Sequence, residues 1–358
     1  MQNQICSHED GGEKKCDFHS IIKIASGAKL KNPENIGRFG VGFISSYQIT
    51  DKPTIESSGL KITLDPLSAG WEGGEFQKKR GTSFFFPWAN DAQSNTRIAL
   101  GSSEITGEDI KKLKKDFEGV LKKSLLFLRH VKEAILKENG ETIIHCVLER
   151  NSSELKITYQ PQNEAEEWYI LRSDATHEAE KLKAKYPRLE NANRNTQVTT
   201  ALSSSTDFGG NGLLYAFLPT EEKTGLPFHI NGDFYPQSER KKLIWEGKHQ
   251  KEWNLMLIDT AAKELASDPE GLLGKLGKKY FWEIIHESKE LYDKNPHDAQ
   301  WFDAFWREFS DTVPDAEVLP TQNGSIRKPK GTFISPNWVK ENHVKVLEGI
   351  GIHLADFK

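Results

Sequence analysis

Ile36-Gly37-Arg38-Phe39-Gly40-Val41-Gly42-Phe43 is the stretch on which the interpretation of this sequence depends. It places three glycines in the pattern G-x-x-G-x-G, and an apolar run continues through residues 43–49. Closely spaced glycines allow positive φ angles and let the main chain approach a ligand. A helix that begins directly after them would direct free N–H groups and the positive end of its dipole at an anion. The stretch therefore predicts a phosphate-binding loop, although a tight structural turn would require the same glycines.

Further segments around this loop extend the pattern. Residues 24–29 (IASGAK) precede it, Asp51-Lys52-Pro53 follows the expected helix, and Gly81-Thr82 opens a later strand. Together these segments resemble the GHKL (Bergerat-fold) group of ATP-binding domains, which includes gyrase, the ninety-kilodalton heat-shock chaperones, histidine kinases and MutL. The likeness is greatest to those chaperones and to the repeat units of sacsin-type proteins. The resemblance implies an α/β sandwich that binds ATP.

The resemblance also assigns roles to single residues. Asp10 corresponds to the aspartate that accepts a hydrogen bond from the adenine amino group, and Thr82 matches a threonine near the adenine. Residues 27–36 correspond to a lid over the nucleotide, in which Lys29 would approach the phosphates. The phosphate loop supplies the remaining candidates: Gly37, Phe39, Gly40, Val41, Gly42 and Phe43. Three of these assignments have plain structural alternatives, which are a turn at Asp10, a solvated Lys29 and an ordinary strand residue at Thr82.

One part of the family's ATPase site has no counterpart in this sequence. In this family a helix ahead of the adenine-binding aspartate carries a glutamate that acts as general base and an asparagine that holds Mg²⁺. A general base must lie within hydrogen-bond reach of the attacking water. Only nine residues precede Asp10, and Glu9 lies beside the expected adenine position. Three explanations stay open: the chain starts late, another chain supplies the helix, or the protein binds nucleotide poorly and does not hydrolyse it.

Composition narrows the class of protein. A chain of 358 residues can form two or three domains, and a net charge of −4 gives no basic field that would attract nucleic acid. The cysteines Cys6, Cys16 and Cys146 lack metal-ligand spacing, so we expect no protein metal cage, no disulfide framework and a reducing compartment. The N-terminus is too polar for a signal peptide, and no apolar run approaches the roughly 20 residues of a membrane helix. A cytoplasmic location is therefore expected.

The order of predicted elements indicates an α+β fold with three domains. Residues 1–90 are expected to form a partial GHKL α/β sandwich, residues 91–268 a chaperone-middle-like (transducer-like) α/β domain, and residues 269–358 a mainly helical C-terminal region. In the first domain, periodicity predicts helices at residues 17–25 and 40–49 and strands at residues 53–55, 60–64 and 81–87. The aromatic content of residues 81–87 favours a buried strand, whereas residues 71–74 are expected to form a loop.

The second and third expected domains begin with a polar, linker-like segment at residues 90–106. Thr106-Gly107-Glu108-Asp109 resembles a capping box and predicts a helix to about residue 128, whose lysines would form a solvated face. The remaining predicted strands lie at residues 142–148, 155–159, 168–171, 196–202 and 213–218, and the remaining helices at residues 177–184, 252–266 and 270–310. A short hairpin near residues 318–324 and a last helix at residues 336–349 complete the prediction.

A second signature lies in residues 218–254. It contains Leu218-Pro219-Thr220, then Phe228-His229-Ile230-Asn231-Gly232-Asp233-Phe234 and Ser238-Glu239-Arg240-Lys241. The segment resembles the part of sacsin-type proteins that follows the ATP-binding domain, and the chaperone middle domain, where an arginine reaches the γ-phosphate. Arg240 is the candidate for that role and Lys241 the second choice, because an arginine is always charged and its planar donors fit phosphate oxygens. The alternative is a basic surface turn. We expect His229 and Asn231 to be buried hydrogen-bonding strand residues.

The sequence supports three functional hypotheses. The first is an ATP- and Mg²⁺-binding, chaperone-like switch, in which nucleotide at residues 37–42 orders the lid, recruits Arg240 and changes the angle between domains. Its protein client is unknown, and a homodimer is possible. The second hypothesis is a non-catalytic scaffold that keeps the fold, and the absent base favours it. The third is a DNA-associated GHKL ATPase in genome defence or repair, which the acidic balance disfavours.

Overall fold

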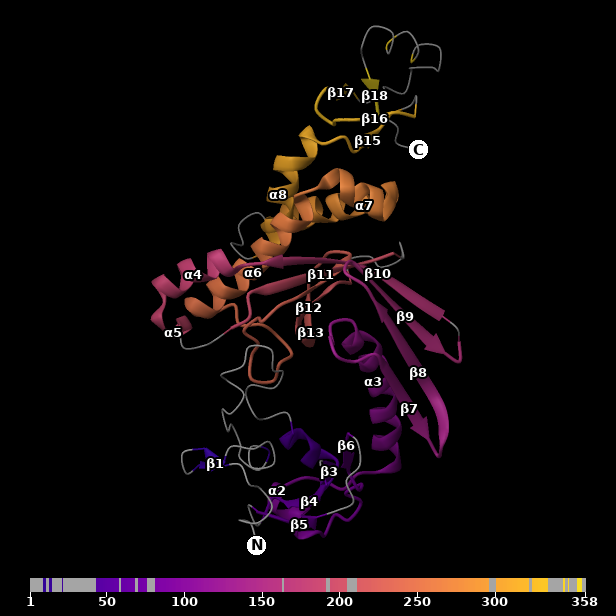
Figure 1. Ribbon diagram of the computed structural model, residues 1–358, viewed down its shortest axis with the longest axis vertical. Coiled ribbons are helices and arrows are strands. Elements are labelled where there is room, and N and C mark those ends of the chain that lie inside the picture. The colour runs from indigo at the N-terminus through magenta and orange to yellow at the C-terminus, as the bar shows by residue number, and fades with distance from the viewer. Residues whose placement is uncertain are drawn as a thin grey trace. The chain divides into compact units, whose positions relative to one another are not determined.

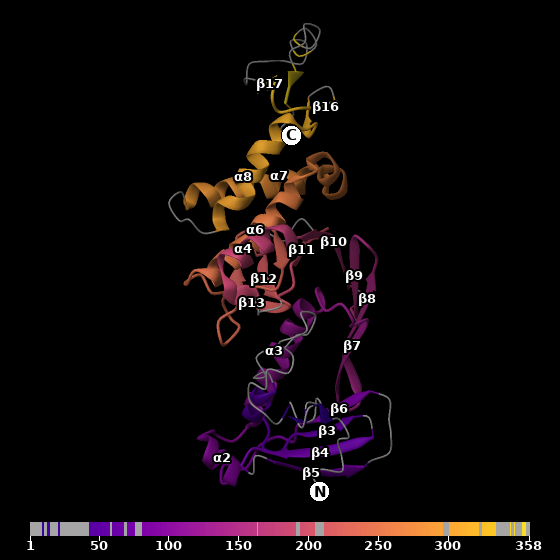
Figure 2. The same ribbon diagram turned by 60° about the vertical axis from the view of Figure 1, so that its left-hand side comes forward.

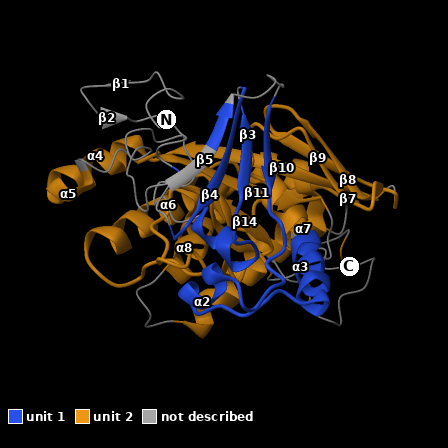
Figure 3. Ribbon diagram, turned by 90° about the horizontal axis from the view of Figure 1, so that it is seen from below, with its two compact units in different colours: residues 1–119 blue, residues 120–358 orange. Residues whose placement is uncertain are grey.

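The structure of the protein is a computed structural model. It describes residues 9–10, 13–14, 21, 43–57, 59–67, 70–75, 81–162, 164–190, 194–204, 211–295, 301–321, 324–333, 344, 347 and 353–355. By their internal contacts the residues divide into two compact units, 1–119 and 120–358 (Figure 3, blue and orange). The mixed α+β class is confirmed, and the division into three domains stays a prediction.

Unit 1 is organised around a four-stranded antiparallel sheet with the order β5-β4-β3-β6 (Figure 2). Its strands are β3 (Thr54–Ser57), β4 (Leu60–Asp65), β5 (Gly70–Glu75) and β6 (Thr82–Phe85). A short 3-10 helix, η1 (Ile44–Gln48), precedes β3. The buried side chains of Ile55, Ile62 and Leu64 form a small core, and Ile21 and Phe43 pack against it. Two two-residue strands, β1 (Glu9–Asp10) and β2 (Glu13–Lys14), pair with each other.

Two sequence predictions for unit 1 are wrong. Residues 71–74 were expected to form a loop, but they belong to β5, where Gly73 faces Ile62 of β4. A Cβ at Gly73 would lie 2.0 Å from the carbonyl oxygen of Lys61, so glycine is required there for close strand approach. The strand at Thr82–Phe85 is confirmed, but all four of its residues are exposed, including Phe84 at 49%. β6 is an edge strand, so its aromatic content did not imply burial.

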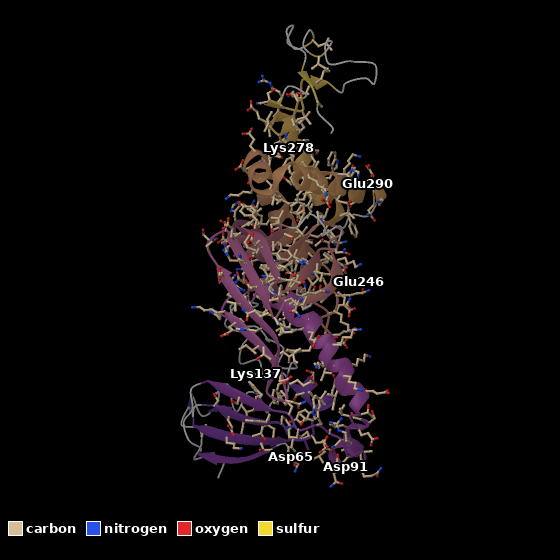
Figure 4. All side chains as sticks on the ribbon, turned by 90° about the vertical axis from the view of Figure 1, so that its right-hand side faces the viewer. Asp65, Asp91, Lys137, Glu246, Lys278 and Glu290 are labelled. Carbon is tan, nitrogen blue, oxygen red and sulfur yellow. The ribbon has the colours of Figure 1, made fainter. Side chains whose placement is uncertain are left out.

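The expected linker at residues 90–106 contains the helix α2 (Asn95–Leu100), so this prediction is also wrong. Asp91, whose exposed side chain is labelled in Figure 4, accepts a hydrogen bond from the main chain of Gln93 in the turn before the helix. The Ser94 hydroxyl accepts from the N–H of Arg97 and caps the helix. Gly101, with φ +60°, ends it in the left-handed conformation.

The capping box at Thr106 is confirmed and starts the helix α3 (Gly107–Leu125). The Asp109 carboxylate accepts from the N–H and the hydroxyl of Thr106, at 2.9 and 2.6 Å, and the hydroxyl accepts from the Asp109 N–H at 3.3 Å. These bonds hold the Asp109 pKa below its ordinary value. At the other end the Arg150 guanidinium donates to the carbonyl oxygens of Leu125 and Leu128. Side chains therefore satisfy main-chain groups at both ends of α3.

Unit 2 contains an eight-stranded sheet with the order β13-β12-β14-β11-β10-β9-β8-β7 (Figure 1). Its strands are β7 (Glu133–Glu138), β8 (Glu141–Arg150), β9 (Glu154–Gln160), β10 (Glu164–Asp174), β11 (Gln197–Ser203), β12 (Leu213–Ala216), β13 (Leu218–Lys223) and β14 (Phe228–Asn231). Neighbouring strands are antiparallel except β12 and β14, which are parallel. Sequence analysis predicted most of these strands, including strand residues at His229 and Asn231 of β14, and it missed β7 and β13.

Helices cover this sheet in unit 2. They are α4 (Thr176–Lys185), α5 (Pro187–Glu190), α6 (His249–Ala266), α7 (Pro269–Lys294) and α8 (Ala304–Thr312), with the 3-10 turns η2 (Trp301–Asp303) and η3 (Val313–Asp315). Consecutive residues of β10 face different cores: Trp168 and Ile170 belong to the core at the end of α3, whereas Tyr169 and Leu171 pack against the core that α4–α8 share. The helical core is continuous across residue 268, the expected domain boundary.

The remaining described residues form two small pairs of strands. The expected hairpin is confirmed by β15 (Leu319–Pro320) and β16 (Ile326–Arg327), and β17 (Thr332–Phe333) pairs with β18 (His353–Leu354). The helix predicted at residues 17–25, the lid and the glycine loop lie outside the described residues, apart from residue 21, and so does most of the helix predicted at 336–349. Within the described ranges no helix has the length and apolarity to cross a membrane.

Candidate functional site

The candidates of the N-terminal region fall mostly outside the part of the chain that the structure describes. Lys29, Gly37, Phe39, Gly40, Val41 and Gly42 are outside the described residues, and their roles stay predictions. Asp10 is described only as a residue of β1 paired with Glu13 of β2. Phe43 and Thr82 are described with their side chains, and both belong to unit 1.

Phe43 lies directly before η1 and belongs to an aromatic group. Its ring centroid is 6.5 Å from that of Tyr47, 6.3 Å from Phe84 and 6.4 Å from Phe86. Its side chain also packs on the small core of unit 1. The Thr82 hydroxyl is exposed and lies 2.8 Å from the hydroxyl of Ser57 on the neighbouring strand. Phe43 thus joins the end of the glycine loop to the sheet, while Thr82 takes part in a cross-strand bond.

Arg97 fixes the segment that follows the glycine loop, a role that sequence reasoning missed. Its guanidinium is fully buried and pairs with the Asp51 carboxylate at 2.6 Å, and Asp51 also accepts from the Ser94 hydroxyl. Its other nitrogens donate to main-chain oxygens at the end of η1 and after α2, namely those of Tyr47, Gln48, Thr50 and Ser103. A cation at a helix C-terminus is stabilising because it meets unsatisfied carbonyl groups.

In unit 2, residues 235–244 form a turn-back that we name the basic hairpin. The main-chain N–H of Ile244 donates to the Tyr235 oxygen at 2.9 Å, and that of Gln237 donates to the Lys242 oxygen at 2.8 Å. The Arg240 N–H donates to the Gln237 oxygen at 2.9 Å and closes the tip. Arg240 has φ 59°, a left-handed conformation that a residue other than glycine rarely adopts. Such a conformation persists only where the surroundings determine it.

The two cationic candidates at this tip differ in their surroundings. Burial lowers the pKa of the half-buried Arg240 guanidinium, which stays charged at neutral pH. Lys241 is exposed, and its ammonium pairs with the Glu221 carboxylate at 2.9 Å. The main chain adds a bond between the same two residues, from the Glu221 N–H to the Lys241 oxygen at 2.6 Å. Lys241 therefore contributes to holding the basic hairpin against β13.

Asp233 fixes the chain just before the basic hairpin. Its buried carboxylate pairs with the Arg194 guanidinium at 2.8 Å and accepts from the Asn195 N–H at 2.9 Å. The guanidinium also stacks on the Tyr235 ring, with its carbon 3.2 Å from the ring centroid. The Trp253 indole N–H donates to the main-chain oxygen of Asp233 at 2.9 Å. Sequence analysis noted Asp233 only as part of the signature at residues 218–254, and Arg194 lies outside that signature.

The family model of the Sacsin domain matches residues 5–79. Sacsin from Homo sapiens is 22% identical over 358 aligned residues, which cover 77% of this chain and 8% of that protein. These matches support a sacsin-type protein. The residues matched by the Sacsin domain include the glycine loop at 37–42 and end before β6. The chain spans less than a tenth of the length of human Sacsin.

Two further candidates have structural roles, as predicted. His229 of β14 accepts the Leu213 N–H on its Nδ1 atom at 2.9 Å, and Asn231 accepts the Phe217 N–H at 3.0 Å. Burial lowers the pKa of His229 to about 3, so the ring is neutral at physiological pH. Both residues therefore hold the N-terminal ends of β12 and β13 rather than a ligand.

Proposed function

We propose that this sacsin-type protein is an ATP-binding, chaperone-like conformational switch. The observation that carries the proposal is Arg240, a cation held at the tip of the basic hairpin in a conformation with a positive φ angle. The glycine-rich stretch at residues 37–42, which falls within the Sacsin-domain match, supplies the phosphate loop. Nucleotide bound at this stretch engages Arg240, and its presence or absence distinguishes two conformations of the protein.

The chemistry of Arg240 supports this role. A left-handed residue costs of order 1–3 kcal/mol, and such strain is typical of ligand-binding positions. The residue with this strained conformation is an arginine. Its guanidinium has several hydrogen-bond donors in one plane, and this geometry fits the oxygens of a phosphate. Partial burial strengthens the attraction between this cation and a phosphate because less water screens it.

The residues present fit the phosphates better than they fit a resident metal ion. Among the described residues, no group of three or more His, Cys, Asp and Glu side chains could hold a metal. Mg²⁺ needs no such cage when a triphosphate supplies its ligands, so it enters the proposal only as the companion of ATP. When bound, ATP supplies a γ-phosphate whose presence or loss distinguishes two states. Hydrolysis would further require a general base within hydrogen-bond reach of the attacking water.

Isothermal titration of the intact chain with ATP and Mg²⁺ tests the proposal. We expect binding that Arg240→Asn weakens about tenfold or more, because charge-assisted hydrogen bonds contribute roughly 1.5–3 kcal/mol. Asparagine tolerates the left-handed conformation, so this change removes the cation and leaves the turn. Gly40→Ala should weaken binding through the phosphate loop. Arg327→Ala, which removes a cation from the exposed strand β16, is the control for net charge. An intact, folded chain without ATP affinity would refute the proposal.

A scaffold that keeps the fold without binding nucleotide is the second candidate function. The exposed aromatic side chains of Phe84, Phe85, Phe86 and Trp88 favour it, because apolar surface of this kind is typical of interaction sites. The same titration separates the two functions. A scaffold would show no ATP affinity, while replacing these aromatic residues would abolish capture of its protein partner.

A further inference from the structure

Asn254 is a buried polar residue inside the helical core of unit 2. It occupies the second turn of α6, next to Trp253, and its side chain has no exposure to solvent. Asparagine is a poor residue for a helix interior because its amide competes for main-chain hydrogen bonds. A buried amide is also costly unless all its polar atoms are paired. The residue therefore needs an explanation other than helix formation or core packing.

The hydrogen bonds of Asn254 supply that explanation, because all of them go to the two ends of the basic hairpin. Its Oδ1 accepts from the N–H of Tyr235 at 2.7 Å. Its Nδ2 donates to the Tyr235 oxygen at 3.2 Å and to the Ile244 oxygen at 3.0 Å. One side chain thus bonds the strand that enters the hairpin and the strand that leaves it. Both amide protons and the acceptor are used, so the amide is satisfied.

No side chain of similar size could replace these contacts. Aspartate would keep the bond from the Tyr235 N–H but would place a carboxylate against the two carbonyl oxygens. Leucine would fill the volume but would remove the partners of the Tyr235 N–H and the Ile244 oxygen, and the Tyr235 oxygen would keep only the Ile244 N–H. The three groups that Asn254 contacts belong to the main chain. Asn254 therefore constrains the backbone conformation of the hairpin, whatever side chains the hairpin carries.

We propose that Asn254 is a positioning residue that directs Arg240 at a nucleotide phosphate. The inference rests on the proposed function, since it names the group that orients the arginine of that site. Asn254 fixes the base of the basic hairpin at Tyr235 and Ile244, and the closed turn then determines where its tip points. Arg240 keeps its strained conformation because the base below it cannot open. Asn254 itself does not contact the ligand.

Limited trypsin digestion measures the first part of this inference without any ligand. Trypsin cleaves after Arg240, Lys241 and Lys242, and cleavage requires the tip to open locally. We expect cleavage there, followed by mass spectrometry of the released ends, to be about tenfold faster in Asn254→Asp, which loses two hydrogen bonds. Thr260→Val is the matched control, because its hydroxyl also lies in α6 but bonds only within the helix, to Met256. An unchanged cleavage rate in Asn254→Asp would overturn the inference.

A double-mutant cycle on ATP affinity measures the second part. If Asn254 acts only through Arg240, then Asn254→Asp weakens ATP binding in the wild type and has no further effect in the Arg240→Asn background. A residue that merely stabilises the fold would weaken both proteins equally. We expect about a threefold loss in the first case and none in the second, by the same non-additivity argument. Asn254→Ala repeats the cycle if the buried carboxylate prevents folding.

The outcomes separate the two proposals. If the losses of ATP affinity in Asn254→Asp and Arg240→Asn add in the double variant, Asn254 does not act through Arg240. The positioning role of Asn254 would then be overturned, and Arg240 would stay a phosphate ligand. Full ATP affinity in Arg240→Asn would overturn both the role of Arg240 and the positioning role that rests on it. Absence of ATP binding in the intact wild-type chain would also overturn both, whereas non-additive losses together with faster cleavage support both.

Discussion

The two sheets of this protein are stabilised in different ways. In unit 1 the described core consists of Ile55, Ile62 and Leu64 with two partly buried neighbours, and the edge strand β6 is exposed along its length. In unit 2 large hydrophobic side chains pack on both faces of an eight-stranded sheet. The free energy of unfolding of a sheet depends mainly on the apolar area it buries. Unit 1 therefore depends more on its polar contacts.

Two buried arginines illustrate this difference between the polar contacts of unit 1 and the large apolar core of unit 2. Arg97 in unit 1 satisfies one carboxylate and the main chain at four positions, so it substitutes for core packing. Arg194 in unit 2 pairs with Asp233 beside a large core and fixes only the segment that leads to the basic hairpin. A single buried cation thus supports the core of a unit in one case and the segment before the basic hairpin in the other.

The largest expected effect is that of Arg97→Ala on unit 1. The change leaves the Asp51 carboxylate and several carbonyl oxygens without their donor, and breaking a buried pair in this way costs about 3–5 kcal/mol. Hydrogen exchange of the β3 and β4 amides in increasing urea measures the loss. Arg307→Ala is the control, because that guanidinium is 47% exposed and an exposed pair contributes about 1 kcal/mol or less. Equal losses in the two variants would contradict the comparison.

The next effect is a pH dependence confined to unit 2. The buried His229 has a folded-state pKa of about 3, below its ordinary value of 6.5, so the unfolded chain binds a proton more readily. Stability is therefore fully present above about pH 6.5 and falls as the pH is lowered, by about 2 kcal/mol at pH 5. Urea unfolding between pH 7 and 5 measures this slope.

His229→Asn is the matched variant, because its amide oxygen can accept the Leu213 N–H without titrating. The slope between pH 7 and 5 should be smaller in this variant by the contribution of one proton. If the free energy of unfolding falls equally in the wild type and the variant between pH 7 and 5, other groups cause the pH dependence and His229 does not.

A smaller effect is expected at the start of α3. Thr106→Ala removes the hydroxyl that bonds with Asp109, and the loss of an N-cap costs about 1 kcal/mol. The change should be visible as faster hydrogen exchange in the first turn of α3, at Glu108 to Ile110. Thr106→Ser keeps the hydroxyl and should behave as the wild type, and a serine variant that frays like the alanine variant would argue against the capping box.

The smallest effect is expected at the exposed strand β6. Phe84 is 49% exposed, so Phe84→Thr should change the free energy of unfolding by only about 0.5 kcal/mol while keeping a β-favouring residue. The variant should also aggregate more slowly in light scattering, because an apolar edge strand promotes association. A loss of about 2 kcal/mol or more would mean that β6 is covered in solution.

Local patterns predicted the elements that local chemistry determines. The helix α3 follows from the capping box at Thr106 and its apolar stripe, and the buried roles of His229 and Asn231 follow from their strand. Long-range contacts were invisible to such patterns. The helix α2 depends on Arg97 meeting Asp51, which is 46 residues away, and β5 depends on glycine at 73 to approach Lys61. Only its contact with Lys61 on the neighbouring strand distinguishes Gly73 from a glycine in a loop.

The same limit applied to the candidate site. Arg240 could be proposed from a resemblance, but its left-handed conformation follows from hydrogen bonds of the turn at Gln237 and of the hairpin base. The supporting residue Arg194 lies outside the signature at residues 218–254. Asn254 lies at the end of that signature, where no local pattern indicates its contact with Tyr235. Their part in the site became visible only when the fold brought them to Asp233 and Tyr235.

The place of β14 in the sheet has a mechanical consequence. β14 is an inner strand that pairs with β11 on one side and β12 on the other, and residues 232–234 connect it directly to the arm that carries Arg240. A pull on the tip is therefore shared by two ladders, and displacing β14 alone would break both. Moving the whole sheet breaks neither ladder, so we expect the basic hairpin to move together with the sheet.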